Sequence, residues 1–291
     1  MYKNSSKIRA QSAMEYLLTY AWAILIIAVV LIALFGLGLF NTNGGRIQPG
    51  TCNIYRPYGP GTTIGINTQG PCNGGLPVYV AAFGGSANIS IDKAVISNSL
   101  RQFSISLWVN PTTLSQQGQM IGEDSPSNCG ATGIFCIEYN NGVVYFKPAG
   151  GSGINTASFN SLVLPGQWYN VVATYSSSGN SVIYLDGVQA ASGALSFSGN
   201  GLLDIGSGDG NGDFFIGQLS NIQVYNISLS SNGVASLYAE GMGGVPIDLD
   251  NIVAWWPLNG DTKDYSGNAY DGRGTSVLFP NNWQATFSTP K

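Results

Sequence analysis

The pattern of hydrophobic and polar residues divides the chain into one long apolar run and a larger part made of short alternating stretches. From Tyr16 to Phe40, a run of 25 residues, no side chain is charged. At about 1.5 Å rise per residue, a helix of this length spans roughly 37 Å, enough for the ~30 Å hydrocarbon core of a membrane. Basic residues and no acidic residue precede the run, which predicts a cytoplasmic N-terminus. We therefore expect a membrane-spanning or filament-core helix over residues 11–40, with the rest of the chain outside.

The part of the chain that follows changes in composition before any strand pattern begins. Residues 41–77 are rich in Gly, Pro, Asn and Thr and show no sustained periodicity. We interpret them as a spacer, stiffened by prolines, that holds the next domain away from the membrane.

From Val78 onward, short alternating or apolar stretches are separated by turn residues, as is typical of antiparallel strands. Asn140-Asn141-Gly142 and Ser177–Asn180 are hairpin turn sequences. One short helix is predicted over Ser230–Ala239, with a serine as its N-cap. Strands are predicted over Val78–Phe83, Ala87–Ile91, Phe103–Val109, Ile134–Tyr139, Val143–Lys147, Trp168–Tyr175, Ser181–Leu185, Phe214–Leu219 and Ile222–Tyr225.

Composition supports this fold class and excludes several functions. Only 9% of residues are charged and 40 of 291 are glycine, which favours many short strands joined by tight turns. We predict a mainly β, antiparallel sandwich preceded by one long hydrophobic helix. The absence of histidine excludes His-based triads, imidazole bases and His zinc sites. Removing Lys3, Lys7 and Arg9 from the 11 basic residues leaves 8 against 15 acidic ones, a balance of −7 that argues against nucleic acid as a partner.

Four cysteines all follow the apolar run: Cys52, Cys72, Cys129 and Cys136. An even number outside the membrane, with no C-x-x-C spacing, predicts disulfides rather than a thiolate metal site. Their order suggests the pairs 52–72 and 129–136, although four cysteines permit three pairings.

Two Asn-x-Ser sequences, beginning at Asn88 and Asn226, match the acceptor pattern for N-glycosylation. Both fit a domain that is exposed at a cell surface.

The residues ahead of the apolar run resemble the class III signal of archaeal type IV pilin-like proteins: basic residues, a small residue, Gln and then Glu. The resemblance implies that a prepilin peptidase cuts between Ala10 and Gln11 and removes residues 1–10. It also implies assembly into a filament, in which Glu15 pairs with the new N-terminal amine of a neighbouring subunit. The alternative is a plain signal anchor whose Glu15 side chain reaches the lipid headgroups.

Four motifs in order resemble a laminin-G-like, concanavalin-A-like jelly roll. They are FSISLWVNP (Phe103–Pro111), PGQWYNVVATY (Pro165–Tyr175), VIYLDG (Val182–Gly187) and FIGQLSNIQVYNISLS (Phe215–Ser230). The resemblance covers residues 78–245 and implies a lectin-like sandwich.

The motif WWPLNGDTKDYSGNAYDG (Trp255–Gly272) ordinarily opens the domain of this family, yet here it lies near the C-terminus. Because the termini of such sandwiches lie close together, we expect Val253–Leu258, within the C-terminal segment 246–291, to complete the same sandwich. The alternatives are a separate appendage or a strand donated to a neighbouring subunit.

Candidate calcium ligands cluster in the loop after that strand: Asp261, Asp264, Asn268 and Asp271. The family resemblance implies that the D-x-S-G-N segment helps to hold Ca²⁺, and oxygen ligands on a loop suit this ion. The family's acidic pair is replaced here by Ser220 and Asn221, so one expected carboxylate is missing and Asn221 is the candidate ligand that this strand supplies. The alternative is that residues 264–268 form only a tight turn.

Binding of a sugar requires aromatic faces beside planar polar groups, for which Trp256, Tyr265 and Tyr270 are the candidates. Trp108, Trp168 and Trp255 are predicted to fill the core. Catalysis is not expected, because the chain has only four glutamates and lacks the E-x-D-x-x-E strand signature of glucanases of related fold.

The sequence therefore predicts an archaeal cell-surface, pilin-like adhesin whose sandwich binds an extracellular glycan or protein, with Ca²⁺ as its candidate cofactor. The alternatives are a purely structural filament subunit and, more weakly, a glycan hydrolase tethered to the membrane.

Overall fold

The structure is a computed structural model that describes eleven segments of the chain. These are residues 20–30, 49–55, 63–69, 77–96, 101–125, 132–148, 151–159, 162–178, 180–197, 201–208 and 212–282. Residues 20–30 are helical, and their side chains are exposed. The rest of the helix predicted over residues 11–40, together with Ala10, Gln11 and Glu15, lies outside the described residues. Within the described segments, no helix has both the length and the apolar character needed to cross a membrane.

The predicted spacer contains regular structure that its composition did not indicate. Two strands, β1 (Pro49–Tyr55) and β2 (Thr63–Gln69), form a two-stranded sheet. The spacer predicted over residues 41–77 therefore contains two paired strands that the sequence pattern did not predict. Backbone hydrogen bonding between two segments needs no hydrophobic periodicity, which is why the pattern missed it.

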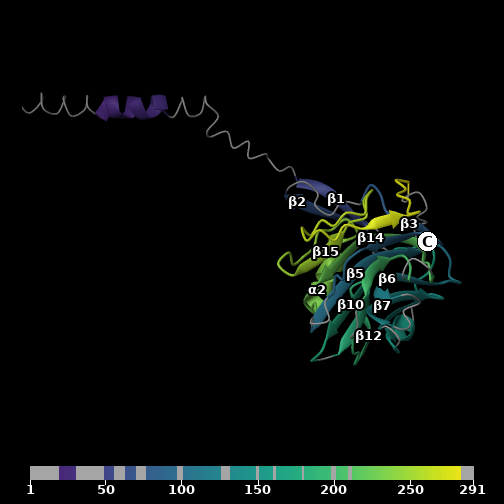
Figure 1. The fold of residues 1–291 in the computed structure, drawn as a ribbon. Helices are drawn as coiled ribbons and strands as arrows, with labels where there is room; N and C mark the ends of the chain where they lie inside the picture. Colours follow the sequence, from purple (N-terminus) through teal and green to yellow (C-terminus); the bar gives the residue numbers. More distant parts are fainter. Residues whose placement is uncertain are drawn as a thin grey trace, which may run out of the picture. The chain divides into compact units, whose positions relative to one another are not determined.

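The remaining strands form two seven-stranded antiparallel sheets that pack as a sandwich (Figure 1). The first, here called the helix-covered sheet, has the order β12-β11-β10-β5-β14-β15, and β3 also pairs with β14. Its strands are β3 (Ala81–Gly84), β5 (Gln102–Pro111), β10 (Tyr169–Ser176), β11 (Ser181–Leu185), β12 (Val188–Gly193), β14 (Ile216–Tyr225) and β15 (Ile252–Trp256).

The second, here called the opposite sheet, has the order β16-β4-β13-β6-β7-β8-β9. Its strands are β4 (Asn88–Ile91), β6 (Gln117–Ser125), β7 (Thr132–Asn140), β8 (Val143–Pro148), β9 (Ile154–Asn155), β13 (Leu202–Ile205) and β16 (Arg273–Thr275). A short 3-10 helix, η1 (Thr156–Phe159), follows β9.

The main core lies between the two sheets and is made of their alternating inward side chains. Ile105, Leu107 and Val109 of β5 face Ile137 and its neighbours in the opposite sheet, and all are buried. Burial of this continuous apolar layer provides the main favourable term for folding. The sandwich predicted from the spacing of short strands is confirmed.

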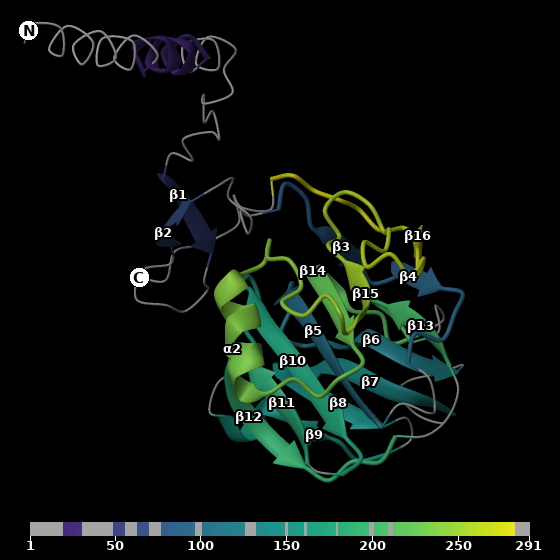
Figure 2. The ribbon, with the colours of Figure 1, turned by 90° about the vertical axis from the view of Figure 1, so that its left-hand side faces the viewer.

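The helix α2 (Ser231–Glu240) covers the outer face of the helix-covered sheet, as Figure 2 shows beside β10, β11 and β12. Ser230 is its N-cap and accepts a hydrogen bond from the Gly233 N–H. Val234 and Leu237 are its buried side chains, which pack against Val172 of β10 and neighbouring residues. The predicted helix and its cap are confirmed.

The β7–β8 hairpin turns where the sequence predicted it. Asn141 and Gly142 both have positive φ, 48° and 85°, which suits a type I′ turn. The strands predicted separately over 214–219 and 222–225 differ from the structure, where they form the single strand β14. Its register shifts between Ser220 and Gln223, so a β-bulge replaces the break.

Candidate functional site

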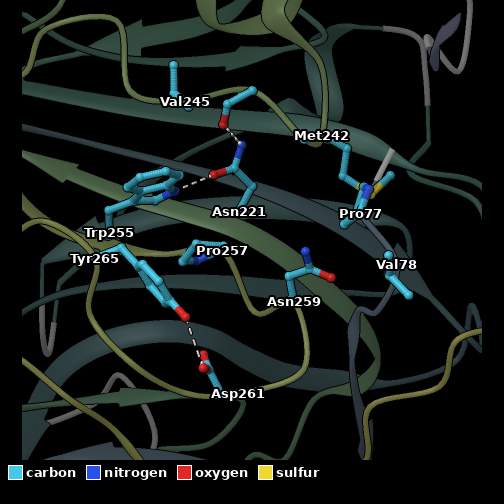
Figure 3. A pocket seen from close by; sticks show the side chains of 12 residues that line it. Pro77, Val78, Asn221, Met242, Val245, Trp255, Pro257, Asn259, Asp261 and Tyr265 are labelled. Atoms are coloured by element: carbon cyan, nitrogen blue, oxygen red, sulfur yellow. Dashed lines mark hydrogen bonds between the residues drawn. The ribbon is translucent and has the colours of Figure 1, made fainter. Parts of the chain in front are cut away.

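A pocket of about 340 Å³ opens on the outer face of the helix-covered sheet, where β14 and β15 meet the loop after α2 (Figure 3). The two strands contribute Asn221 and Trp255, and the loop after β15 contributes residues that include Asp261 and Tyr265. Its full lining is Pro77, Val78, Asn221, Met242, Gly243, Gly244, Val245, Trp255, Pro257, Asn259, Asp261 and Tyr265.

The pairing of β15 with β14 decides which tryptophan reaches this pocket. Trp256 lies opposite Ile222, and Ala254 lies opposite Val224; all four are buried in the main core. Trp255, which points to the other side of the sheet, is therefore the residue that lines the pocket. The expected roles of the two tryptophans were reversed: Trp256 is fully buried and cannot contact a ligand in this fold, whereas Trp255 is half-buried. Trp108 and Trp168 are buried, as predicted.

Asn221 organises the pocket from the bulge of β14. Its φ of 46° is in the left-handed region, which Asn tolerates better than most residues, and its side chain is buried. The Asn221 Oδ1 atom accepts hydrogen bonds from Trp255 Nε1 at 2.8 Å and from Gln223 Nε2 at 3.0 Å. Its Nδ2 donates to the Gly244 carbonyl at 2.8 Å. One amide thus fixes the Trp255 ring and the loop after α2, as the dashed lines in Figure 3 show.

Two aromatic rings form an angled wall of the pocket. The Trp255 and Tyr265 ring centroids are 6.1 Å apart with 65° between the planes. The Tyr265 side chain is 54% exposed, and its hydroxyl donates to Asp261 Oδ2 at 3.0 Å. This hydrogen bond and the nearby Asp261 charge raise the pKa of the Tyr265 phenol, which keeps it protonated. The wall therefore presents ring surface beside a carboxylate.

Asp264, the central residue of the predicted calcium loop, is occupied by hydrogen bonds. Its Oδ1 accepts from the Trp255 and Ser266 N–H groups at 2.9 and 2.8 Å. Its Oδ2 accepts from Ser266 Oγ and the Tyr270 N–H at 2.8 and 3.0 Å. A carboxylate offers about four acceptor positions, and here donors fill them. The arrangement does not fit a Ca²⁺ site at Asp264, because a cation would have to displace these donors.

The same loop covers the free edge of β15. The Tyr265 N–H donates to the Trp255 carbonyl, and Asn268 Nδ2 donates to the Val253 carbonyl. The D-x-S-G-N segment therefore satisfies strand groups that would otherwise be unpaired, which also protects an edge against pairing with other chains. This observation favours the alternative that residues 264–268 form a structural turn.

The other predicted metal ligands are also engaged elsewhere. Asp271 Oδ1 accepts from the Asp264 N–H at 2.9 Å, and Asp261 lies at the pocket. Asn221 stands on β14, where its Oδ1 already accepts hydrogen bonds from Trp255 Nε1 and Gln223 Nε2. Among the residues that the structure describes, no three His, Cys, Asp or Glu side chains gather as a metal site would require. Ca²⁺ binding gains no support from these contacts and stays a prediction.

The three predicted ligand-binding aromatic residues lie in three different environments. Tyr265 lines the pocket, Trp256 is in the core, and Tyr270 packs against the edge of the core beneath Lys93, whose Nζ is 5.6 Å from the ring centroid. Only Tyr265 is placed to contact a ligand in this pocket.

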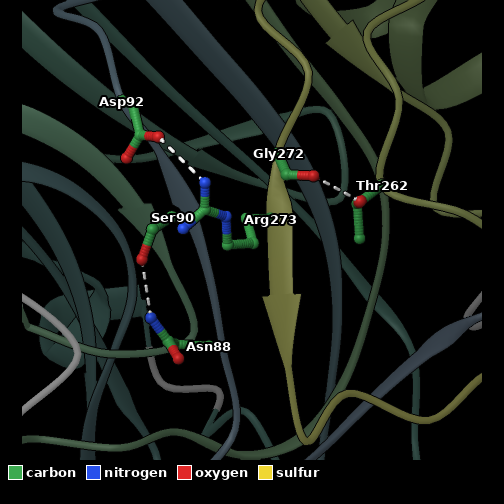
Figure 4. A network of polar contacts seen from close by, with 6 residues as sticks. All are labelled: Asn88, Ser90, Asp92, Thr262, Gly272 and Arg273. Carbon is green, nitrogen blue, oxygen red and sulfur yellow. Dashed lines mark hydrogen bonds and ion pairs between the residues drawn. The ribbon is translucent and has the colours of Figure 1, made fainter.

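The two glycosylation sequences differ in accessibility. Asn88 is 6% exposed in β4, between β13 and β16, and its Nδ2 donates to Ser90 Oγ at 2.8 Å (Figure 4). Figure 4 also shows Arg273 of β16 reaching Asp92 beside it, an ion pair of 3.8 Å. Burial of the Asn88 side chain argues against attachment of a glycan to the folded domain, and the expectation at this residue stays a prediction. Asn226, by contrast, is exposed at the end of β14.

Cys136 is buried in β7, and the side chains of Cys52, Cys72 and Cys129 lie outside the described residues. Both disulfide pairs stay predictions.

Sequence reasoning missed Trp255, Asn259 and the loop 242–245 as parts of the site. The sequence of two adjacent tryptophans does not indicate which one faces inward. The loop residues 242–245 carry no charged or hydrogen-bonding side chain that would mark them as part of a site. Asn221 and Asp261 were selected as candidate calcium ligands, whereas the structure places them in the pocket lining.

Comparison with known proteins identifies relatives by fold. A family described as the concanavalin A-like lectin/glucanases superfamily matches residues 83–235, more than half of the chain. A candidate carbohydrate-binding protein from Bacteroides ovatus superimposes with a TM-score of 0.54 at 18% identity, covering 71% of this chain and 60% of that one. The heptameric SAP-like pentraxin from Limulus polyphemus superimposes with a TM-score of 0.51 at 15% identity, covering 70% of this chain and 96% of that one. The chain thus spans less than two thirds of the Bacteroides protein. No curated protein matches.

Proposed function

Since the chain belongs to the concanavalin A-like lectin/glucanases superfamily, we propose that it is a surface-displayed, lectin-like protein whose sandwich binds carbohydrate in the Trp255 pocket. The observation that carries this proposal is the angled wall of Trp255 and Tyr265 beside Asn259 and Asp261. The likeness to a candidate carbohydrate-binding protein from Bacteroides ovatus is consistent with it but bears on the fold alone.

The chemistry of the pocket suits a sugar ring. A pyranose has an apolar face of C–H groups and a rim of hydroxyls, so it needs a ring surface to stack on and planar polar groups at the edge. Trp255 and Tyr265 supply the surface, and Asn259 and Asp261 supply the polar edge. The Trp255 ring is fixed by its hydrogen bond to Asn221, so little side-chain entropy is lost when a ligand stacks on it.

We propose binding without catalysis at this pocket. Hydrolysis of a glycosidic bond ordinarily requires two carboxyl groups that flank it. Among the residues that line the pocket, Asp261 is the single carboxylate. A hydrolytic role would need a second acid that the pocket lining does not supply.

The N-terminal part of the chain supports display at a surface. The uncharged run from Tyr16 to Phe40 and the basic residues before it favour an anchor or filament core with the sandwich outside. We propose a pilin-like adhesin, processed between Ala10 and Gln11 and assembled through Glu15. The N-terminal sequence of the protein from native membranes tests this part: a chain starting at Gln11 supports it, and one starting at Met1 overturns it.

The binding site is tested by a glycan array probed with the full chain, followed by titration calorimetry with the best ligand. We expect Trp255→Ala to abolish detectable binding, because the stacking surface is removed. Tyr145→Ala is the matched control: Tyr145 is a half-buried aromatic residue of the opposite sheet. Its loss should leave affinity unchanged.

The outcomes separate the candidate functions. Binding lost in Tyr145→Ala but kept in Trp255→Ala would move the site to the opposite sheet. The absence of binding to any glycan by a folded wild-type chain would leave the structural filament subunit as the better account.

A further inference from the structure

The pocket is unusual in its balance of hydrogen-bonding groups. Asn221 is the buried amide in it: its Oδ1 accepts from Trp255 and Gln223, and one of the two N–H groups of its Nδ2 donates to the Gly244 carbonyl. The Trp255 Nε1–H already donates to Asn221, and the Tyr265 hydroxyl already donates to Asp261, so neither is available to a ligand. Asn259 accepts the Tyr79 N–H through Oδ1, and its exposed Nδ2 stays available as a side-chain donor. The lining residues therefore offer acceptors more than donors.

Asp261 is the main free acceptor. Its Oδ1 accepts from the Lys263 N–H at 3.2 Å and its Oδ2 accepts from the Tyr265 hydroxyl at 3.0 Å. A carboxylate has about four acceptor positions, so capacity remains on both oxygens. Asp264, three residues later, has no such capacity. Within the described residues, the ion pairs join Lys147 to Glu138 and Arg273 to Asp92, and neither involves Asp261.

The charge of the lining has one sign. Of its twelve residues, Asp261 is charged and no lysine or arginine is present. The two ring surfaces of Trp255 and Tyr265 stand beside it, and the faces of aromatic rings attract cations. The whole chain carries a net charge of −4, which adds to the negative potential. Acceptors, ring faces and negative charge together are complementary to a cation that donates hydrogen bonds.

We propose that the pocket selects ligands that carry a protonated primary amine, which for a carbohydrate means an amino sugar whose amino group is free. The ammonium group lies between the Asp261 carboxylate and the faces of Trp255 and Tyr265, and the sugar ring stacks on Trp255. This inference rests on the proposed function, since it names the class of sugar that the same pocket takes. Uronic acids and other anionic sugars are rejected by Asp261.

The test is a pair of ligands that differ only at the amine. The full chain is titrated with a glucosamine oligomer, the same oligomer after N-acetylation, and a uronic acid oligomer of equal length. We expect the free amine to bind at least tenfold more tightly than its acetylated form, since a charge-assisted hydrogen bond is worth about tenfold or more in affinity. The uronic acid oligomer should not bind.

Two variants with the same change in charge locate the effect. Asp261→Asn should lower affinity for the free amine about tenfold more than it lowers affinity for the acetylated oligomer. Asp92→Asn is the matched control, because Asp92 is 75% exposed and lies outside the pocket lining. An equal loss in both variants would show a general charge effect and overturn the inference.

The failure of this inference is distinct from the failure of the proposed function. Equal binding of the free and acetylated oligomers, lost in Trp255→Ala but not in Asp261→Asn, would overturn selection for amines and leave carbohydrate binding intact. Absence of binding to all three oligomers and to every other glycan would overturn both.

Discussion

Trp255 and Trp256 are neighbours in the chain and lie in opposite environments. Trp256 fills the core between the two sheets, and its Nε1 donates to the Tyr270 carbonyl at 2.8 Å. Trp255 stands on the outer face, where its Nε1 donates to Asn221 and its ring lines the pocket. The inner face of the β14–β15 pair thus serves stability, and the outer face offers a place for a ligand. The difference shows that residue type says little about role until the partner strand is known.

Of the substitutions that test this comparison, Trp256→Ala should lower the free energy of unfolding most. Trp256→Ala removes a fully buried ring and leaves a cavity, so we expect the free energy of unfolding to fall by about 3–5 kcal/mol. Trp255→Ala should cost only about 1 kcal/mol, because it removes one hydrogen bond and a half-buried ring. Urea unfolding of the two variants measures the contrast. Similar losses in both would mean that Trp255 is also a core residue.

A second comparison is between two carboxyl groups: Glu123, which faces the core between the sheets, and Asp261, which lines the pocket on the outer face. Glu123 of β6 pairs with Phe135 and Leu203, both in the core, and is fully buried. One of its oxygens accepts from the Val95 N–H and from the Ile96 N–H at 2.6 Å, and the other has no hydrogen-bond partner. Burial raises the pKa of Glu123 to about 8, although the two N–H donors oppose this.

The sign of the pH dependence follows from that raised pKa. Below the unfolded value of 4.5 both states are protonated; between 4.5 and about 8 the unfolded chain has lost the proton and the folded chain keeps it. Stability therefore falls as pH rises through this window, by roughly 4 kcal/mol between pH 5 and pH 8. Glu123→Gln should flatten much of the slope in urea unfolding. Burial also raises the pKa of Asp186 to about 7, which adds a slope of the same sign that this variant keeps. An unchanged slope would contradict the assignment to Glu123.

A smaller difference in stability is expected between variants of the two aspartates Asp264 and Asp261. Asp264→Ala leaves the donors of Trp255, Ser266 and Tyr270 without their acceptor, which should cost about 1–3 kcal/mol in stability. Asp261→Asn should cost less stability than Asp264→Ala, because its amide oxygen keeps one of the two hydrogen bonds and both lie at the exposed surface. Thermal unfolding compares the two variants. A chelator should not shift the melting temperature of the wild type; a clear fall would revive the calcium prediction.

The smallest effect on stability is expected at Asn226, the exposed one of the two glycosylation residues. Asn226 is exposed and Asn88 is buried, so intact mass of the native protein should show a glycan that Asn226→Gln removes. Asn88→Gln is the control and should leave the glycan in place. Neither the glycan nor Asn226→Gln should change the unfolding midpoint appreciably. A glycan at Asn88 would mean that attachment precedes folding of β4.

The sequence determined much of this fold because its signals are local. Strand alternation, the Asn-Gly turn after β7 and the Ser230 cap each depend on a few neighbouring residues, so the hairpins, α2 and the sandwich class could be predicted. β15 (Ile252–Trp256), from the displaced motif near the C-terminus, lies beside β14 as an edge strand. The motif could suggest this position because its strand is apolar on both faces.

Only the tertiary structure decided the site. The bulge at Asn221 and the register of β15 against β14 depend on pairs far apart in sequence, and together they turn Trp255 outward and Trp256 inward. The same distance in sequence hid the role of Asp264, whose donors include the Trp255 N–H, and therefore made a structural turn resemble a calcium loop. Residue types indicated the candidate site residues. The role of each candidate depended on the hydrogen bonds that its side chain makes, and only the folded chain sets these bonds.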